Sequence, residues 1–366
     1  MSSVWLPCGD YHQNYAKDQG WWQTRFIKGK MILLLLAVFV GIPLVGGGYG
    51  MSVGTMIGYT AMGALGVQLL IGYSGLLTLG HAAFIAVGAY TSTMLILQFP
   101  WPQFLLDSGL AYPISVVVAG IVAGLWSVLF GLPSVKVKGF YLILTTMAAQ
   151  FITVDFILTQ YISQIGGRGQ AFSLPPGTIK IGPWVVDDER SVYYLMAVLL
   201  TLMVIVLANL LRSKPGRAWV AIRDNDIAAE ALGINIVWYK LLSFFVAGFM
   251  AGIAGAFWVC NTAALSPEHF SWFLSLWLVG VILIGGVGSI QGAIFGSIFM
   301  VVVMELLQMA VIPLAEYWPA ILMDFAYIKD MAFGLAICAF LIYEPNGLAY
   351  RWWQAKNYFN LWPFSY

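Results

Sequence analysis

The ionisable side chains inside the apolar stretches are the first candidates for chemistry. Three carboxylates fall there, those of Asp155, Glu305 and Asp330. An unpaired charge in hydrocarbon is costly, so each of these residues is a functional-site hypothesis by default. Asp155 and Asp330 lie close to the ends of their stretches, whereas Glu305 lies near the centre of one. A proton relay usually needs several such groups, so structural pairing and a role in transport are both open for Glu305 and Asp155.

No other grouping of residues is typical of catalysis. The sequence contains no G-x-x-x-x-G-K-[ST] phosphate loop, so it predicts no ATP site of its own. The histidines and cysteines lie far apart: His12, His81, His269, Cys8, Cys260 and Cys338. This scatter supports neither a metal cluster nor a disulfide framework. We therefore expect no catalytic residue, no metal and no cofactor in this chain.

The composition decides the class of protein. Of the 366 residues, 61% are apolar and 9% are charged, against roughly 25% charged in soluble domains. A composition with so many apolar and so few charged residues excludes a soluble enzyme and a disordered chain. There are 17 basic and 16 acidic residues, and this near-neutral balance argues against a nucleic-acid-binding protein. The sequence predicts an all-α, polytopic membrane protein whose surroundings are lipids.

Ten apolar stretches are candidates to span a membrane, since a spanning helix needs about 20 mostly apolar residues. They are 31–49, 53–71, 79–98, 110–131, 140–160, 191–211, 240–262, 272–287, 291–312 and 328–343. The eighth is short and bounded by glycines. The transmembrane domain is expected at 31–343, between a polar and aromatic segment at 1–30 and an aromatic tail at 344–366.

The positions of Lys and Arg predict the orientation. With a cytoplasmic N-terminus and ten spans, most basic residues fall inside, in the segments 1–30, 132–139, 212–239 and 344–366. The loop 161–190, rich in Gly and Pro, then lies outside. We therefore expect both termini in the cytoplasm.

Two glycine-rich segments interrupt the apolar pattern. One is 72–81 and the other is 285–292, in different halves of the chain. Breaks in corresponding halves can mark the substrate path of a transporter, because freed backbone groups can line a cavity. Two tight cytoplasmic turns are the alternative. The candidates for the path are Tyr73, Ser74, Thr78, Gly285 and Gly286.

The loop 212–239 has the most specific pattern. Its apolar residues recur at helical spacing, and Gly233 is placed to end that helix. A short amphipathic helix on the cytoplasmic side could dock into a groove on a soluble partner. It could also lie on the membrane surface.

Several blocks together resemble a known family. In the loop they are 221–225, 230–235 and 239–244. Further blocks stand at 72–75, 79–84, 251–256, 266–270 and 285–289. Taken in the order in which they occur along the chain, these blocks resemble the second permease subunit of branched-chain amino acid ABC importers. The resemblance covers roughly residues 31–350.

The resemblance implies a type II ABC importer permease that pairs with a second, related permease. Two cytoplasmic ATPases would bind ATP and Mg²⁺ and supply the energy, and an external binding protein would deliver the substrate. The resemblance also implies which residues couple this chain to an ATPase. They are Arg223, Asp224, Glu230, Ala231 and Gly233. The glycine breaks would lie near the substrate path.

Two departures from the family pattern leave the substrate open. Lys136 and Lys138 stand where the family usually has Arg, and the usual Asn after the external glycines is absent at 168–170. Members of this group also carry urea, short amides and aromatic or carboxylic acids. We predict a multi-pass permease of the bacterial inner membrane that imports branched-chain or related small amino acids and amides. An ion-coupled secondary transporter that uses Glu305 is the alternative, and a lipid-modifying membrane enzyme is disfavoured.

Overall fold

The chain folds almost entirely into helices. The computed structural model describes residues 25–135, 139–162, 172–175, 177–262, 264–317 and 324–361. The predicted N-terminal segment is therefore described only from Arg25 onward. Lys136, Lys138 and the glycine motif at 166–169 also lie outside the described residues.

The first half of the described chain runs as α2 (Arg25–Leu36), η1 (Ala37–Gly41), α3 (Ile42–Val45), α4 (Gly47–Val67), η2 (Gln68–Tyr73), α5 (His81–Leu97), α6 (Gln103–Asp107), α7 (Ala111–Val135), α8 (Phe140–Phe151) and η3 (Ile152–Ile162). The second half runs as β1 (Phe172–Ser173), β2 (Lys180–Ile181), β3 (Trp184–Val185), α10 (Glu189–Arg212), α11 (Lys214–Asp224), α12 (Asp226–Ala231), α13 (Ile236–Thr262), β4 (Ala264–Leu265), η4 (Pro267–Phe270), α14 (Trp272–Gly285), α15 (Ile290–Tyr317), α16 (Phe325–Tyr343) and α17 (Gly347–Leu361). The elements η1, η2 and η3 are π-helical continuations of α-helices, and η4 is a 3₁₀ turn.

All ten predicted spans fall on helices. Within the described residues, seven helices are long and apolar enough to cross a membrane. Shorter apolar helices occupy the other three positions, at Ile32–Val45, His81–Leu97 and Trp272–Gly285. The last has 14 residues, or about 21 Å, which is less than the hydrocarbon thickness. The all-α membrane class is confirmed, while the count of ten and the side of the termini stay predictions.

The predicted boundary between the first two spans was wrong. The predicted spans leave residues 50–52 between them, but α4 already begins at Gly47 and runs through Gly50. The break lies at Gly47, whose φ is 57°. Only glycine adopts this left-handed conformation without a steric penalty, whereas Gly50 continues the helix.

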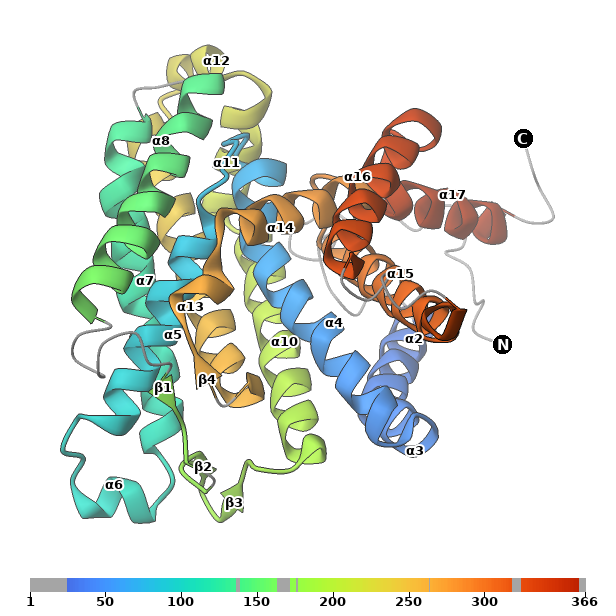
Figure 1. The fold of residues 1–366 in the computed structure, drawn as a ribbon. Helices are drawn as coiled ribbons and strands as arrows, with labels where there is room; N and C mark the ends of the chain where they lie inside the picture. The colour runs from blue at the N-terminus through green and yellow to red at the C-terminus, as the bar shows by residue number, and fades with distance from the viewer. Residues whose placement is uncertain are drawn as a thin grey trace.

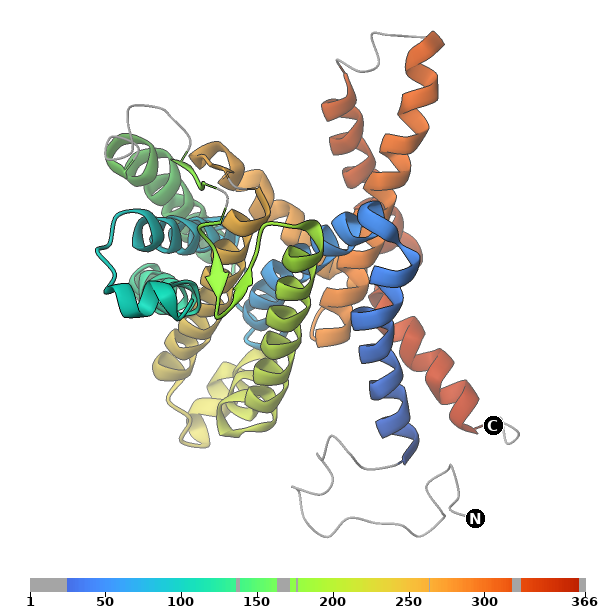
Figure 2. The ribbon, with the colours of Figure 1, turned by 90° about the horizontal axis from the view of Figure 1, so that it is seen from below.

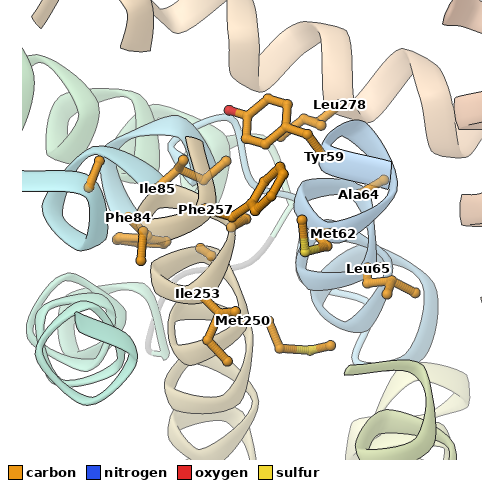
Figure 3. Close-up of a cluster of buried hydrophobic side chains, with 14 of the residues drawn as sticks. Tyr59, Met62, Ala64, Leu65, Phe84, Ile85, Met250, Ile253, Phe257 and Leu278 are labelled. Atoms are coloured by element: carbon orange, nitrogen blue, oxygen red, sulfur yellow. The ribbon is translucent and has the colours of Figure 1, made fainter. Parts of the chain in front are cut away.

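Small residues bring α5, α7 and α13 together into the core of the bundle (Figure 1). Gly88 of α5 lies against the backbone of Gly252, and Gly252 lies against that of Gly120 in α7. Close backbone approach of this kind is how helices associate in a membrane. Large apolar side chains such as Met62, Phe84 and Phe257 fill the space between these helices and α4 (Figure 3).

Four helices extend away from this bundle (Figure 2). α2, α15, α16 and α17 lie on the far side of α4 and radiate from it (Figure 2). Their apolar side chains are largely exposed, for example Leu306 and Ile312 in α15 and Leu335 in α16. This surface therefore faces lipid or another protein.

The two ends of the bundle are built differently (Figure 1). At one end lie α11 and α12. At the other end β1 pairs with β4, and Gly182 donates a hydrogen bond to the Gly109 carbonyl. The loops 99–110, 172–190 and 264–271 thus gather at the end opposite α12, as the predicted inside–outside topology requires.

Candidate coupling site

The two glycine breaks meet in space, although they are more than 200 positions apart. A Cβ atom added to Gly72 would lie 2.6 Å from the backbone nitrogen of Gly288. The fully buried Gln68 donates from Nε2 to the carbonyl oxygens of Gly286 at 3.0 Å and Ser289 at 2.8 Å. We call this contact between residues 68–75 and 285–289 the glycine junction.

A third turn joins the glycine junction from the C-terminal side. Gly347 begins α17, and a Cβ atom added to it would lie 2.5 Å from the Cα of Gly286. Both residues have positive φ, 114° at Gly286 and 74° at Gly347. Glu344 pairs with Arg351 across this turn, and the hydrogen bond from Arg351 lowers the pKa of the Glu344 carboxyl. The start of α17 is therefore held against the end of α14.

Polar side chains from α8 and α14 hold the segment that leads into α5. Thr146 accepts a hydrogen bond from the Leu79 N–H, and Ser275 accepts one from Ala82. Gln150 accepts from the Ala83 N–H at 2.7 Å. The bonds to Ala82 and Ala83 satisfy two orphan donors in the first turn of α5, and the bond to Leu79 fixes the chain just before it.

Arg223 connects the glycine junction to the loop 212–239. Its Nη1 donates a 2.7 Å hydrogen bond to the Gly72 carbonyl, and its Nη2 pairs with Asp224 at 2.9 Å. A Cβ atom on Gly288 would lie 3.3 Å from the same Nη1. The loop and both glycine breaks thus lie at the same end of the bundle.

The loop contains two short helices, whereas the sequence pattern predicted one. The break is at Asn225, whose extended backbone (φ −160°) separates α11 from α12. Its side chain accepts from the Ala228 N–H at 3.1 Å, which caps α12. The predicted stop at Gly233 is confirmed: its φ is 83°, and Ile234 donates to the Ala229 carbonyl as in a Schellman motif.

The loop has an anchored face and an exposed face. Trp219 is fully buried, and its Nε1 donates to the Tyr239 carbonyl at 2.8 Å, which ties α11 to α13. On the opposite face Ile227 and Leu232 are 74% and 81% exposed. We call Ile227, Glu230, Ala231, Leu232 and Gly233, all exposed, the coupling tip.

The structure brings the predicted path residues to the glycine junction and its continuation into α5. Ser74 and Thr78 are buried, Tyr73 is half-buried, and Gly285 and Gly286 form the end of α14. Four further polar residues that hold this region were not among the predicted site residues: Gln68, Thr146, Gln150 and Ser275. Each is a polar residue inside an apolar stretch, and that was the available signal.

The three carboxylates inside the apolar stretches lie elsewhere, and Asp330 is exposed on α16. Glu305 accepts a 2.8 Å hydrogen bond from the Tyr49 hydroxyl, which joins α15 to α4. Asp155 is exposed on η3. Within the described part of the chain, no three His, Cys, Asp or Glu side chains gather to hold a metal ion.

Comparison with known sequences identifies the family. The profile described as "Branched-chain amino acid transport system / permease component" matches residues 49–343. The chain belongs to this family. The matched region contains the glycine breaks at 72–81 and 285–292 and the loop 212–239, and it ends where α16 ends. A comparison with solved structures gave no significant match.

Individual relatives agree with this family. The chain is 29% identical to the high-affinity branched-chain amino acid transport system permease protein LivM of Escherichia coli, over 86% of this chain and 73% of the relative. It is 26% identical to a probable branched-chain amino acid transport permease protein LivM of Methanocaldococcus jannaschii, over 85% and 86%. Identity to the E. coli permease protein LivH is 24%, over 81% and 94%. The chain is therefore a multi-pass membrane permease subunit of an ABC importer.

Proposed function

We propose that this permease imports branched-chain or related small amino acids and amides across the bacterial inner membrane. It would pair with a second, related permease, and two cytoplasmic ATPases would drive it. An external binding protein would deliver the substrate. The relatives are named for branched-chain amino acid transport, which supports this class of substrate. The similarity of the chain to both LivM and LivH supports a partner permease of the same fold.

The hydrogen bond from Arg223 to Gly72 is the observation that carries the proposal. It connects the loop that would meet an ATPase to the junction of the two glycine breaks. If ATP binding moves the loop, Arg223 and Trp219 would transmit that motion to α4 and α13. Alternating access needs such a connection, because the energy source lies outside the membrane.

The coupling tip supports the ATPase as the partner. Ile227 and Leu232 are large apolar side chains that protrude from a loop rather than from a spanning helix. Apolar anchors on a short helix are typical of docking into a groove on another protein. Glu230 lies between them and would add a charged contact at the rim. ATP and Mg²⁺ would bind to the ATPases, since this sequence has no phosphate loop.

Reconstitution into vesicles tests this function. The chain is purified together with a partner permease, ATPases and a binding protein from the same organism, and uptake of radiolabelled leucine is followed with and without ATP. We expect uptake only with ATP and with all components present. Glu230→Lys and Gly233→Pro should abolish uptake, because they alter the coupling tip and its helix stop.

Uptake by this chain without any ATPase would contradict the proposal. So would unchanged ATP-driven uptake in both variants. A Glu268→Lys variant is the control, because Glu268 is exposed in η4 at the opposite end of the bundle.

A further inference from the structure

Two buried hydrogen-bond donors lie side by side between α4 and α13 and have no acceptor among the described residues. The rings of Tyr59 in α4 and Trp258 in α13 are 4.6 Å apart, tilted by 44°. Tyr59 is 8% exposed. Neither the Tyr59 hydroxyl nor the Trp258 Nε1 finds a hydrogen-bond partner among the described residues, although both atoms are buried. Buried donors without partners are rare in native proteins and call for an explanation.

Comparable groups elsewhere in this chain do find partners. The partnered groups are the Tyr112 hydroxyl with Cys260, the Tyr193 hydroxyl with the Val38 carbonyl, the Trp126 Nε1 with Thr153, and the Trp219 Nε1 with the Tyr239 carbonyl. The fold can therefore satisfy buried phenol and indole groups. At Tyr59 and Trp258 it leaves two adjacent donors open.

A line of side chains leads from these donors to the end of the bundle opposite α12. The Trp258 ring lies 5.9 Å from the ring of His269, which is exposed in η4. Tyr59 lies in the middle of α4, and Figure 3 shows its hydroxyl directed away from that helix, above Phe257 and toward Ile85. Apolar side chains surround it, among them Leu278.

We propose that Tyr59 and Trp258 bind the carboxylate of the substrate inside the membrane. This inference rests on the proposed function and assigns two specificity-determining residues to it. A carboxylate only accepts hydrogen bonds, and the two groups here are unpartnered donors on rings 4.6 Å apart. The apolar side chains around Tyr59 suit an aliphatic substrate side chain. Neutral donors also bind an anion less tightly than Arg or Lys would, which permits release during transport.

The test uses the complete, reconstituted transporter and two probes, leucine and 3-methylbutylamine. 3-Methylbutylamine keeps the aliphatic side chain and the ammonium group of leucine but has no carboxyl or amide oxygen that could accept a hydrogen bond. Tyr59→Phe removes only the hydroxyl, and Trp258→Phe removes only the indole donor with part of the ring. We expect each variant to raise the KM for leucine uptake by about tenfold. Inhibition of that uptake by 3-methylbutylamine should change by less than about twofold.

Tyr112→Phe and Tyr193→Phe are the matched controls, because they remove tyrosine hydroxyls that already have partners. Both should keep the wild-type KM for leucine. The melting temperature of each complex shows that the variants are folded. Tyr59→Phe conserves the ring and the packing, so it keeps the test valid if Trp258→Phe does not assemble.

Three outcomes would overturn the inference. One is a wild-type KM for leucine in folded Tyr59→Phe and Trp258→Phe. Another is an equal loss in the KM for leucine and in the inhibition by 3-methylbutylamine, which would mean that the two residues shape the path without recognising the carboxylate. The third is a raised melting temperature of the Tyr59→Phe or Trp258→Phe complex together with unchanged uptake. The two donors would then bind only water molecules and not the substrate. Failure of the proposed function is distinct, because wild-type protein would then show no ATP-driven uptake.

Discussion

The guanidinium of Arg223 donates a 2.7 Å hydrogen bond to the backbone carbonyl of Gly72. Arg223 lies in the last turn of α11, and Gly72 belongs to the π-helical end of α4. Asp224 holds the guanidinium from the other side. One side chain thus connects the part of the chain that would contact an ATPase to the point where the two halves of the permease meet.

Arg223→Ala should uncouple ATP hydrolysis from uptake. The change removes a charge-assisted hydrogen bond to a partly buried carbonyl, and we expect ATP-driven uptake to fall by roughly tenfold or more. Arg223→Lys should recover only part of this, because an ammonium group cannot reach Gly72 and Asp224 with a planar fork. Uptake and ATPase rates measured on the same vesicles check the prediction. Lys214→Ala, an exposed position on the same helix, should have no effect, and equal uptake in both Ala variants would contradict the role of Arg223.

Gly72→Ala should destabilise the glycine junction. The added Cβ would lie 2.6 Å from the Gly288 nitrogen, and neither backbone can move without breaking the bonds from Gln68. Overpacking of this kind costs about 1–3 kcal/mol. We expect a lower melting temperature of the purified complex and a loss of uptake.

Gly334→Ala in α16 is the control for Gly72→Ala. A Cβ atom at Gly334 meets nothing within 4 Å, so this change should leave stability unchanged or increase it by up to about 1 kcal/mol. A Gly72→Ala complex that melts at the wild-type temperature would show that the two backbones are not in contact.

Ile227→Asp and Leu232→Asp should each weaken assembly with the ATPase. Both side chains are exposed in the isolated chain, so a charge there leaves the permease fold intact. It would be unfavourable in an apolar groove on the partner. Co-purification of the ATPase with the permease measures the effect, and we expect at least about a tenfold loss. Leu106→Asp, at an exposed position of α6 at the opposite end, should leave the ATPase bound. Unchanged co-purification of Ile227→Asp and Leu232→Asp would place the docking surface elsewhere.

Glu305→Gln should transport almost as well as the wild type. The Gln oxygen still accepts the hydrogen bond from Tyr49, and an ATP-driven mechanism needs no proton on this side chain. We expect a change below about twofold in uptake at constant ATP, with or without an uncoupler. Abolished uptake in a folded Glu305→Gln complex, together with sensitivity to the uncoupler, would instead favour an ion-coupled transporter.

The sequence alone determined the all-α membrane class, the positions of the apolar stretches and the helix stop at Gly233. Apolar stretches of spanning length and the asymmetry of Lys and Arg are properties of single segments, so they can be read without a fold. The stop at Gly233 was predictable for the same reason, because a Schellman motif involves only neighbouring residues. The break at Asn225 is also local, since its side chain caps α12, but the sequence pattern did not single it out.

Only the tertiary structure decided which segments meet. Nothing in the local pattern joins Gly72 to Gly288, or shows that Arg223 turns inward to this junction while Ile227 and Leu232 face outward. Such contacts depend on how helices distant in sequence pack, and packing is set by small residues and buried polar side chains from several helices at once. For the same reason the hydrogen bonds of Gln68, Gln150 and Ser275 could not be predicted from the sequence, because their partners lie on other elements. The same holds for Tyr59 and Trp258, whose shared lack of an acceptor becomes visible only when α4 and α13 lie side by side.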